Sequence, residues 1–373
     1  MIETQELTVD IPSYVYCLIP YIHAKLKSEG SASAISLLSN LDLAGLPAYT
    51  RGESFDSARI DFHIKDIHGF ERSTNILKLD MHEHKHDTFE AGLASISQTL
   101  AEGKAVVLSG TTYCLPYSSE YYNPSFIETF GYGVNATMYI VGDHWFSVYG
   151  IDETGVRIYD PIPNKFTGTI PLEDFRHAWG GNALVPELAD KKDVEKCTIY
   201  GQLDIHVGHI FSQAELNDLF LRTANTITTL YLKGESFNLG EERCWFGHAA
   251  VTTFMHDLEQ FAGQAIPAER IEGCLYFMRV NRLQMGVLLT DMRELALIPQ
   301  DIMDAYLPLQ RKWETIYNSF VINVARKRAD VVERTIAFLK EALDLEMHLF
   351  MRLQLHLNGT PLLDRAPAIG AAD

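Results

Sequence analysis

The sequence lacks the paired cysteines that a disulfide framework or a zinc site requires. Its five cysteines are odd in number and far apart, and none belongs to a CxxC pair: Cys17, Cys114, Cys197, Cys244 and Cys274. This usage predicts reduced thiols inside a cell, each of them free to act as a nucleophile.

Long apolar runs and excess basic charge are missing as well. No stretch approaches the roughly 20 apolar residues of a membrane span, and the acidic N-terminus lacks the basic region of a signal peptide. We therefore expect a cytoplasmic protein that does not enter a membrane. The 31 Lys and Arg against 49 Asp and Glu give a net charge of -18, which excludes a general nucleic-acid-binding protein.

The residue pattern predicts two domains, at 1–205 and 206–373. In the first, apolar periodicity predicts helices at 17–30, 88–103 and 171–179, and strands at 105–109, 136–141, 144–149, 156–159 and 167–170. A charged stretch at 186–196 predicts a linker. In the second, a capping box at Ser212 and Glu215 precedes helices at 216–232, 244–263, 271–297, 299–325 and 330–357. The predicted class is α+β with an antiparallel sheet, followed by an all-α C-terminal domain.

A histidine and an aspartate lie on neighbouring predicted strands. Strand alternation puts His144 on one face with Phe146 and Val148, and pairing about the turn at 151–155 brings Asp160 beside it. A carboxylate there accepts the imidazole N–H and supports the imidazolium. A half-buried histidine and a turn aspartate that caps Pro161 are the structural alternative.

Cys17 is a third candidate residue beside His144 and Asp160, because it lies at the start of the first predicted helix. Unpaired N–H groups and the positive end of the helix dipole stabilise a thiolate at such a position. The order of cysteine, histidine and aspartate suits a nucleophile, its base and the group that orients the base. A small buried hydrophobic residue is the alternative for Cys17.

Four motifs follow in order between Tyr113 and Trp179. They are Tyr113-Cys-Leu-Pro-Tyr117, Asp143-His-Trp-Phe-Ser-Val-Tyr-Gly-Ile-Asp152, Val156-Arg-Ile-Tyr-Asp-Pro161 and Leu172-Glu-Asp-Phe-Arg-His-Ala-Trp179. In these motifs the chain resembles the butirosin biosynthesis protein H family of papain-fold acyltransferases, and the helical remainder at 240–353 is similar to that family's C-terminal region.

The resemblance implies a papain-like cysteine-protease fold with Cys17 as nucleophile, His144 as general base and Asp160 as its orienting partner. It also implies natural-product biosynthesis, in which the cysteine takes an acyl group from the phosphopantetheine thioester of an acyl carrier protein and passes it to a small-molecule amine. The product is an amide, and the reaction requires neither a cofactor nor a metal. The acyl group, the amine and the oligomeric state stay open.

Three alternatives remain. Cys114 is the second choice of nucleophile. A cysteine peptidase or amidase would use the same triad with water as the acceptor. Because no glutamine shortly before Cys17 completes an oxyanion hole, a catalytically inactive papain-like scaffold that only binds a carrier protein is the third.

Binding residues are expected in two places. Tyr113, Tyr117, Tyr121 and Tyr122 either line a substrate pocket or pack a long loop. A local basic surface on this acidic chain suits an acidic carrier protein, with a solvated helix face as the alternative; its residues are Arg311, Lys312, Arg326, Lys327 and Arg328.

Two further patterns suggest metal or thiol chemistry. The stretch Met81-His-Glu-His-Lys-His-Asp87 has histidines at every second position, but we interpret it as a solvated loop. Cys244 and His248 are four residues apart on a predicted helix, a spacing that favours packing over catalysis.

Overall fold

Six strands form the larger of two sheets in a computed structural model that describes residues 15–60, 72–124, 143–163, 165–185, 200–261 and 268–359. The chain divides into two units, one comprising 1–31 and 77–210, the other 32–76 and 211–373. The predicted strand at 136–141 and the predicted linker at 186–196 lie outside the described residues.

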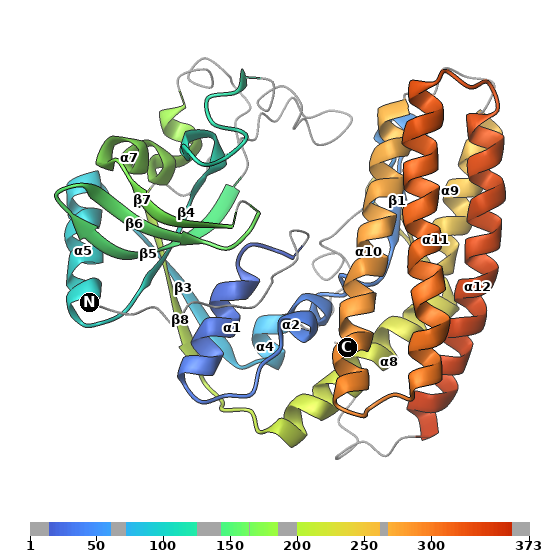
Figure 1. Ribbon diagram of the computed structural model, residues 1–373, viewed down its shortest axis with the longest axis horizontal. Coiled ribbons are helices and arrows are strands. Elements are labelled where there is room, and N and C mark those ends of the chain that lie inside the picture. Colours follow the sequence, from blue (N-terminus) through green and yellow to red (C-terminus); the bar gives the residue numbers. More distant parts are fainter. Residues whose placement is uncertain are drawn as a thin grey trace. The chain divides into compact units, whose positions relative to one another are not determined.

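The sheet of the first unit is antiparallel throughout, in the order β3-β8-β4-β5-β6-β7 (Figure 1). Its strands are β3 (Leu79–Lys85), β4 (Val106–Thr111), β5 (Asp143–Asp152), β6 (Gly155–Asp160), β7 (Phe166–Ile170) and β8 (Gly201–Val207). The antiparallel α+β prediction is confirmed at this level.

The hairpin of β5 and β6 is tighter than the predicted five-residue turn. The ladder continues to the pair Asp152–Gly155, so only residues 153 and 154 form the connection. The backbone N–H of Thr154 donates to Asp152 Oδ1 at 2.8 Å. Gly155 has φ 145°, and a Cβ there would lie 2.0 Å from the carbonyl oxygen of Ile170, so this position requires glycine.

Two helices bury the apolar face of this sheet, α5 (Phe89–Ala101) and α7 (Leu172–Gly180). Thr88 caps α5, since its hydroxyl accepts from the N–H of Ala91 at 3.2 Å. Phe146 and Val148 of β5 are fully buried against Phe175 and Trp179 of α7 in one core. The strand alternation expected from the sequence therefore sets which face of β5 is inside.

The second unit has more strand than the all-α prediction allows. A four-stranded antiparallel sheet runs β2-β1-β10-β9. Its strands are β1 (Ala48–Arg51), β2 (Arg59–Ile60), β9 (Ser236–Leu239) and β10 (Glu242–Phe246). β10 replaces the start of the helix predicted at 244–263, because alternating burial of Cys244 and Phe246 serves a sheet with one covered face.

The α-helices described in this unit include α10, α11 and α12, which pack side by side (Figure 1). In full, these described helices are α2 (Ile35–Leu41), α4 (Ser73–Ile76), α8 (Gln213–Lys233), α9 (His248–Phe261), α10 (Ala268–Glu294), α11 (Gln300–Ala325) and α12 (Val331–Gly359). The capping box of Ser212 and Glu215 forms as expected, with Ser212 N–H donating to Glu215 Oε2 at 2.8 Å. Among the described residues, no helix combines the length and apolar character needed to cross a membrane.

The boundary between the units differs from the predicted one. Residues 32–76 belong to the second unit, although they precede most of the first in the chain. The pairing of β1 with β10 explains this, because Ala48 lies opposite Phe246 and Thr50 opposite Cys244. Long-range pairing of this kind leaves no local sequence signal.

Candidate catalytic site

His144 and Asp160 lie at one end of the β5–β6 hairpin and contact each other directly. His144 Nε2 is 2.7 Å from Asp160 Oδ2, and the side chains are 4% and 0% exposed. Burial leaves the pair little competing water, so the carboxylate fixes the orientation of the ring.

The register of the hairpin explains the contact. Ser147 pairs with Tyr159, so continuing the ladder by one step places Asp160 opposite Phe146, two residues along β5 from His144. His144 and Asp160 thus share a face as diagonal neighbours, at a separation that a histidine side chain spans. The hairpin interpretation correctly predicted the shared face.

Cys17 lies in the turn immediately before α1 (Ile19–Ser28). The helix therefore begins two residues later than predicted, and Cys17 precedes it instead of opening it. Its side chain interacts electrostatically with His144 and helps to raise the pKa of that ring. Because Nε2 of His144 faces Asp160, the ring nitrogen left for the sulfur is Nδ1. The structure therefore brings together the three residues that the sequence singled out as a triad.

Tyr21 holds α1 against the two strands that carry the pair. Its hydroxyl lies 3.1 Å from the carbonyl oxygen of Tyr159 and 3.3 Å from that of Trp145, the neighbours of Asp160 and His144. Tyr21 lies in the first turn of α1, so these contacts hold the start of the helix, which follows Cys17 directly, against the two strands. Burial and the charge of Asp160 raise the pKa of Tyr21, which keeps its hydroxyl protonated.

The electrostatics of the site favour a charged imidazole. Burial lowers the pKa of His144, but the interactions with Asp160 and Cys17 outweigh burial and raise this pKa to about 10. At neutral pH the ring is then an imidazolium held between a carboxylate and a sulfur. A protonated imidazole beside a cysteine stabilises the thiolate, which is the nucleophilic form.

Asp160 has a second partner that sequence reasoning assigned to substrate. Tyr117, in the loop after the short helix η2 (Thr112–Cys114), donates its hydroxyl to Asp160 Oδ2 at 2.9 Å. The other oxygen, Oδ1, is buried and has no hydrogen-bond partner within the described part of the chain. Both donors therefore share one oxygen.

The other predicted tyrosines lie in different surroundings. Tyr113 is fully buried in the core of the first unit, which excludes direct contact with a substrate in this structure. Tyr121 is on the surface and donates to Asp174 Oδ1 at 3.1 Å. The hydroxyl of Tyr122 lies 3.3 Å from His177 Nδ1. The ring of Tyr122 packs on those of both Tyr113 and Tyr121, a contact that suits the alternative in which these tyrosines pack the loop.

The alternative nucleophile Cys114 is 1% exposed and belongs to the same core as Tyr113. Its side chain is hydrogen bonded to Tyr122, and burial together with the charge of Cys114 raises the pKa of Tyr122 to about 12. Its surroundings are those of a packed core residue, whereas Cys17 is partly exposed beside His144. The geometry therefore favours Cys17.

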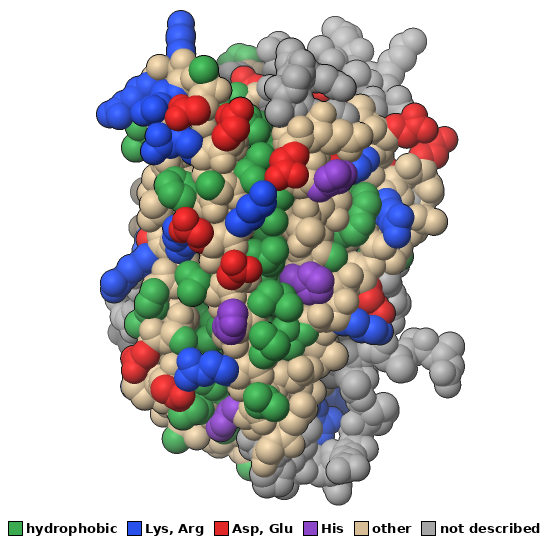
Figure 2. Space-filling view, turned by 90° about the vertical axis from the view of Figure 1, so that its right-hand side faces the viewer, with side chains coloured by type: hydrophobic (Ala, Val, Ile, Leu, Met, Phe, Trp, Pro, Cys, Tyr) green, Lys and Arg blue, Asp and Glu red, His purple; other side chains and the backbone are tan. Residues whose placement is uncertain are grey.

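The predicted basic surface separates into two places along α11. Arg311 and Lys312 lie mid-helix and Arg326, Lys327 and Arg328 follow its end, so about 22 Å of helix separates them. Lys312 is paired with Glu341, and Arg328 with Asp330 at 2.9 Å. Figure 2 shows a face where charged and apolar side chains are mixed and Lys and Arg gather at one end.

The histidine-rich stretch is a strand, β3, instead of the expected loop. It pairs with β8, and this pairing places Asp80 opposite His206 and His82 opposite Asp204. His82 Nε2 lies 2.9 Å from Asp80 Oδ2, and His84 Nε2 lies 2.9 Å from Asp204 Oδ2, so the imidazoles pair with carboxylates. Within the described residues no cluster of ligands is arranged to hold a metal ion.

Cys244 and His248 do not share a helix. Cys244 is a buried residue of β10, and His248 begins α9. Cys244 lies opposite Thr50 of β1, so it packs the small sheet.

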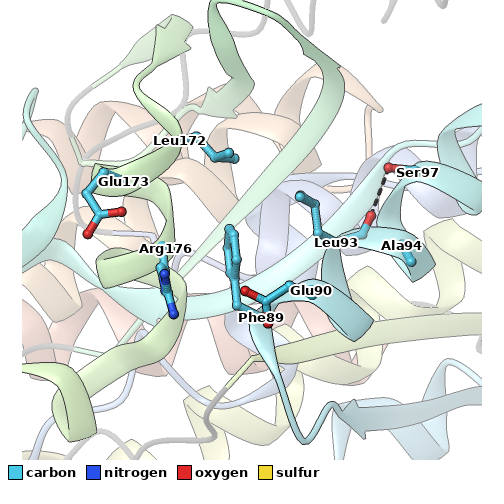
Figure 3. A pocket seen from close by; sticks show the side chains of 8 residues that line it. All are labelled: Phe89, Glu90, Leu93, Ala94, Ser97, Leu172, Glu173 and Arg176. Atoms are coloured by element: carbon cyan, nitrogen blue, oxygen red, sulfur yellow. Dashed lines mark hydrogen bonds between the residues drawn. The ribbon is translucent and has the colours of Figure 1, made fainter.

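A cavity of about 680 Å³ lies between α5 and α7 (Figure 3). Phe89 and Arg176 line it, with the guanidinium 5.4 Å from the ring centre. The hydroxyl of Ser97, also in its lining, donates to the carbonyl of Leu93 at 2.8 Å. Its lining includes none of Cys17, His144 and Asp160, so it is not the site of the predicted chemistry.

No protein-family model and no curated protein matches this chain. The geometry of Cys17, His144 and Asp160 therefore has to support any statement about function.

Proposed function

We propose that the chain is a cysteine-dependent acyltransferase in which Cys17 is the nucleophile, His144 the proton carrier and Asp160 the residue that orients His144. The observation that supports this most is that His144, held by Asp160 Oδ2 at 2.7 Å, also interacts with the Cys17 side chain. This is the arrangement of a nucleophile, its base and the group that orients the base.

In the first half-reaction His144 acts as the acid, and its positive charge stabilises the thiolate form of Cys17. The Cys17 thiolate attacks the carbonyl carbon of a thioester, forming a thioester to Cys17 as the bond to the donor sulfur breaks. The His144 imidazolium gives its proton to the departing thiolate. The free energy of the donor thioester is kept in the acyl-enzyme, so no nucleotide is consumed.

In the second half-reaction an amine attacks the acyl-enzyme. His144, now neutral, takes the proton that the amine loses, and the Cys17 thiolate leaves. The products are an amide and the free enzyme, with the proton back on His144. The proposed donor is the phosphopantetheine thioester of an acyl carrier protein, and the proposed acceptor is a small-molecule amine of natural-product biosynthesis.

Intact-mass spectrometry tests the acyl-enzyme directly. The purified chain is mixed with an acyl carrier protein loaded with acetyl or butyryl groups, without amine. We expect an increase equal to one acyl group on the wild type and none on Cys17→Ala, with peptide mapping to Cys17. An adduct on another residue, or none with any loaded carrier, would contradict the proposal.

The acceptor separates transfer from hydrolysis. Acyl-enzyme formed with a soluble thioester is diluted into buffer with or without an amine such as glycinamide. Amide as the main product supports transfer, and free acid at the same rate in both buffers supports the amidase alternative. Tight carrier binding without any acylation would identify a catalytically inactive scaffold.

A further inference from the structure

Tyr117 is expected from the sequence to line a substrate pocket, but its hydroxyl donates a hydrogen bond to the carboxylate of Asp160. Its ring stacks on Phe166 of β7, with centroids 3.8 Å apart and an interplanar angle of 7°. Phe166 is the ladder partner of Asp160, so the stack carries the tyrosine hydroxyl over the carboxylate. The result is a hydrogen bond of 2.9 Å to Oδ2, the oxygen that also accepts from His144 Nε2 at 2.7 Å.

The loop that carries Tyr117 is fixed at both ends. Leu115 N–H donates to Thr112 O at 3.1 Å, Ser118 N–H to Leu115 O at 2.9 Å, and Tyr122 N–H to Tyr113 O at 2.9 Å. The hydroxyl is therefore delivered by a folded turn and a stacked ring. Removal of the hydroxyl alone leaves both of these supports in place.

The Tyr117 hydroxyl and His144 Nε2 both donate to Asp160 Oδ2, so each weakens the hydrogen bond of the other. A hydrogen bond to a carboxylate stabilises its negative charge, and it is strongest when no cation is beside that oxygen. Tyr117 therefore stabilises the state in which His144 is neutral more than the state in which it is charged. Burial and Asp160 raise the pKa of Tyr117, so its hydroxyl stays a neutral donor.

We propose that Tyr117 is a positioning residue of the catalytic pair, whose hydroxyl limits how tightly Asp160 holds the imidazolium of His144. The effect of Tyr117 on His144 does not depend on the proposed function. Its catalytic consequence does: His144 would release its proton more easily to the leaving thiolate. Among the described residues, the other titratable groups that interact with the pair are Cys17, in the turn before α1, and Tyr21 of α1.

The test is the titration of His144 in the full-length chain, which needs no substrate. Cys17 raises the pKa of His144, so a Cys17→Ala background brings the transition to lower pH, where it is easier to follow. Histidine labelled with ¹³C at Cε1 is followed by NMR, and the His144 signal is assigned by its loss in His144→Gln. Tyr117→Phe is compared in this background with Tyr121→Phe, which removes a hydroxyl of the same loop that donates to a different carboxylate, Asp174 of α7.

We expect Tyr117→Phe to raise the pKa of His144 by about half a unit or more, and Tyr121→Phe to leave it unchanged. A lower pKa would mean that Tyr117 only orders the carboxylate, and an unchanged pKa that it only packs on Phe166; either result overturns the proposal. Circular dichroism and thermal unfolding establish that Tyr117→Phe is folded.

Kinetics provide the second readout, with Cys17 restored. If the acyl transfer is as proposed, Tyr117→Phe lowers kcat several-fold with little change in KM, because the imidazolium releases its proton less readily. If Tyr117→Phe raises the pKa of His144 while the wild type transfers no acyl group, that result refutes the proposed function and leaves the role of Tyr117 intact. An unchanged kcat alongside the raised pKa would overturn the catalytic consequence.

Discussion

His144 Nε2 lies 2.7 Å from Asp160 Oδ2 at a point where both side chains are almost completely buried. In the unfolded chain the imidazole would titrate near its ordinary pKa of 6.5, whereas in the fold its pKa is about 10. Folding is therefore coupled to proton binding at this residue.

The first prediction concerns stability and pH. A group whose pKa is raised on folding contributes stability that is complete below about pH 6.5 and is lost as the pH rises through about 10. We expect the free energy of unfolding of the wild type to fall between pH 7 and 10 more steeply than that of His144→Gln. Urea unfolding at each pH measures this difference, and parallel curves for the two proteins would contradict it.

The second prediction concerns thiol reactivity. Three of the cysteines that the structure describes, Cys114, Cys244 and Cys274, are buried, while Cys17 is partly exposed beside an imidazolium. We expect iodoacetamide to modify Cys17 first in a Cys197→Ser background. Asp160→Asn removes the charge that supports the imidazolium, so it should slow this reaction at pH 7 by about tenfold or more.

Asp174→Asn is the matched control for that experiment. It changes a carboxylate that accepts a tyrosine hydroxyl on the surface of the same unit, and the rate should not change. Peptide mapping locates the modified cysteine. Equal rates for Asp160→Asn and the wild type would show that the pair does not activate Cys17.

The shared face of His144 and Asp160 was predictable because it depends on local rules. Alternation along a strand and a short turn determine which residues of a hairpin lie together, and both are readable in the sequence. The exact turn was not predictable, since the bulge between Val148 and Gly150 shifts the register. Cys17 could be placed near His144 only through chain order and the resemblance.

Other features depend on contacts that local sequence does not encode. Residues 32–76 join the second unit because β1 pairs with β10, almost 200 positions away in the chain. The role of Tyr117 depends on its stack on Phe166, which no spacing indicates. Tyr21 could have been suspected, since in the helix predicted from residue 17 it follows Cys17 by one turn.

The third prediction tests the hairpin that carries the pair. Gly155→Ala combines an unfavourable φ of 145° with a Cβ 2.0 Å from the carbonyl oxygen of Ile170, so a backbone shift is required. We expect a loss of about 1–3 kcal/mol in the free energy of unfolding. Gly103→Ala is the control, because Gly103 also has a positive φ of 83° but has nothing within 4 Å of the added Cβ.

A Gly155→Ala loss clearly larger than that of Gly103→Ala would establish that the close approach to β7 matters beyond backbone strain. Equal losses in urea unfolding would contradict the tight turn between β5 and β6.

The fourth prediction concerns a buried ion pair in the second unit. Arg282 of α10 donates to both carboxylate oxygens of Glu346 of α12, at 2.6 and 2.8 Å, and the side chains are 4% and 1% exposed. Trp313 Nε1–H donates to the same carboxylate at 2.7 Å, and the Tyr231 hydroxyl also donates to it. Glu346→Leu leaves the guanidinium buried without its partner, so we expect a loss of about 3–5 kcal/mol in the free energy of unfolding.

The double variant Arg282→Met with Glu346→Leu separates the buried charge from the packing. Without a charge to desolvate, part of the lost stability should return, although the buried donors of Trp313 and Tyr231 still lack their acceptor. Lys312→Met is the surface control: its pair with Glu341 is partly exposed, so the loss should stay below about 1 kcal/mol. Urea unfolding of all four proteins measures these differences. A double variant that loses as much as the single one would mean that α10, α11 and α12 depend on this network itself, rather than on avoiding an unpaired charge.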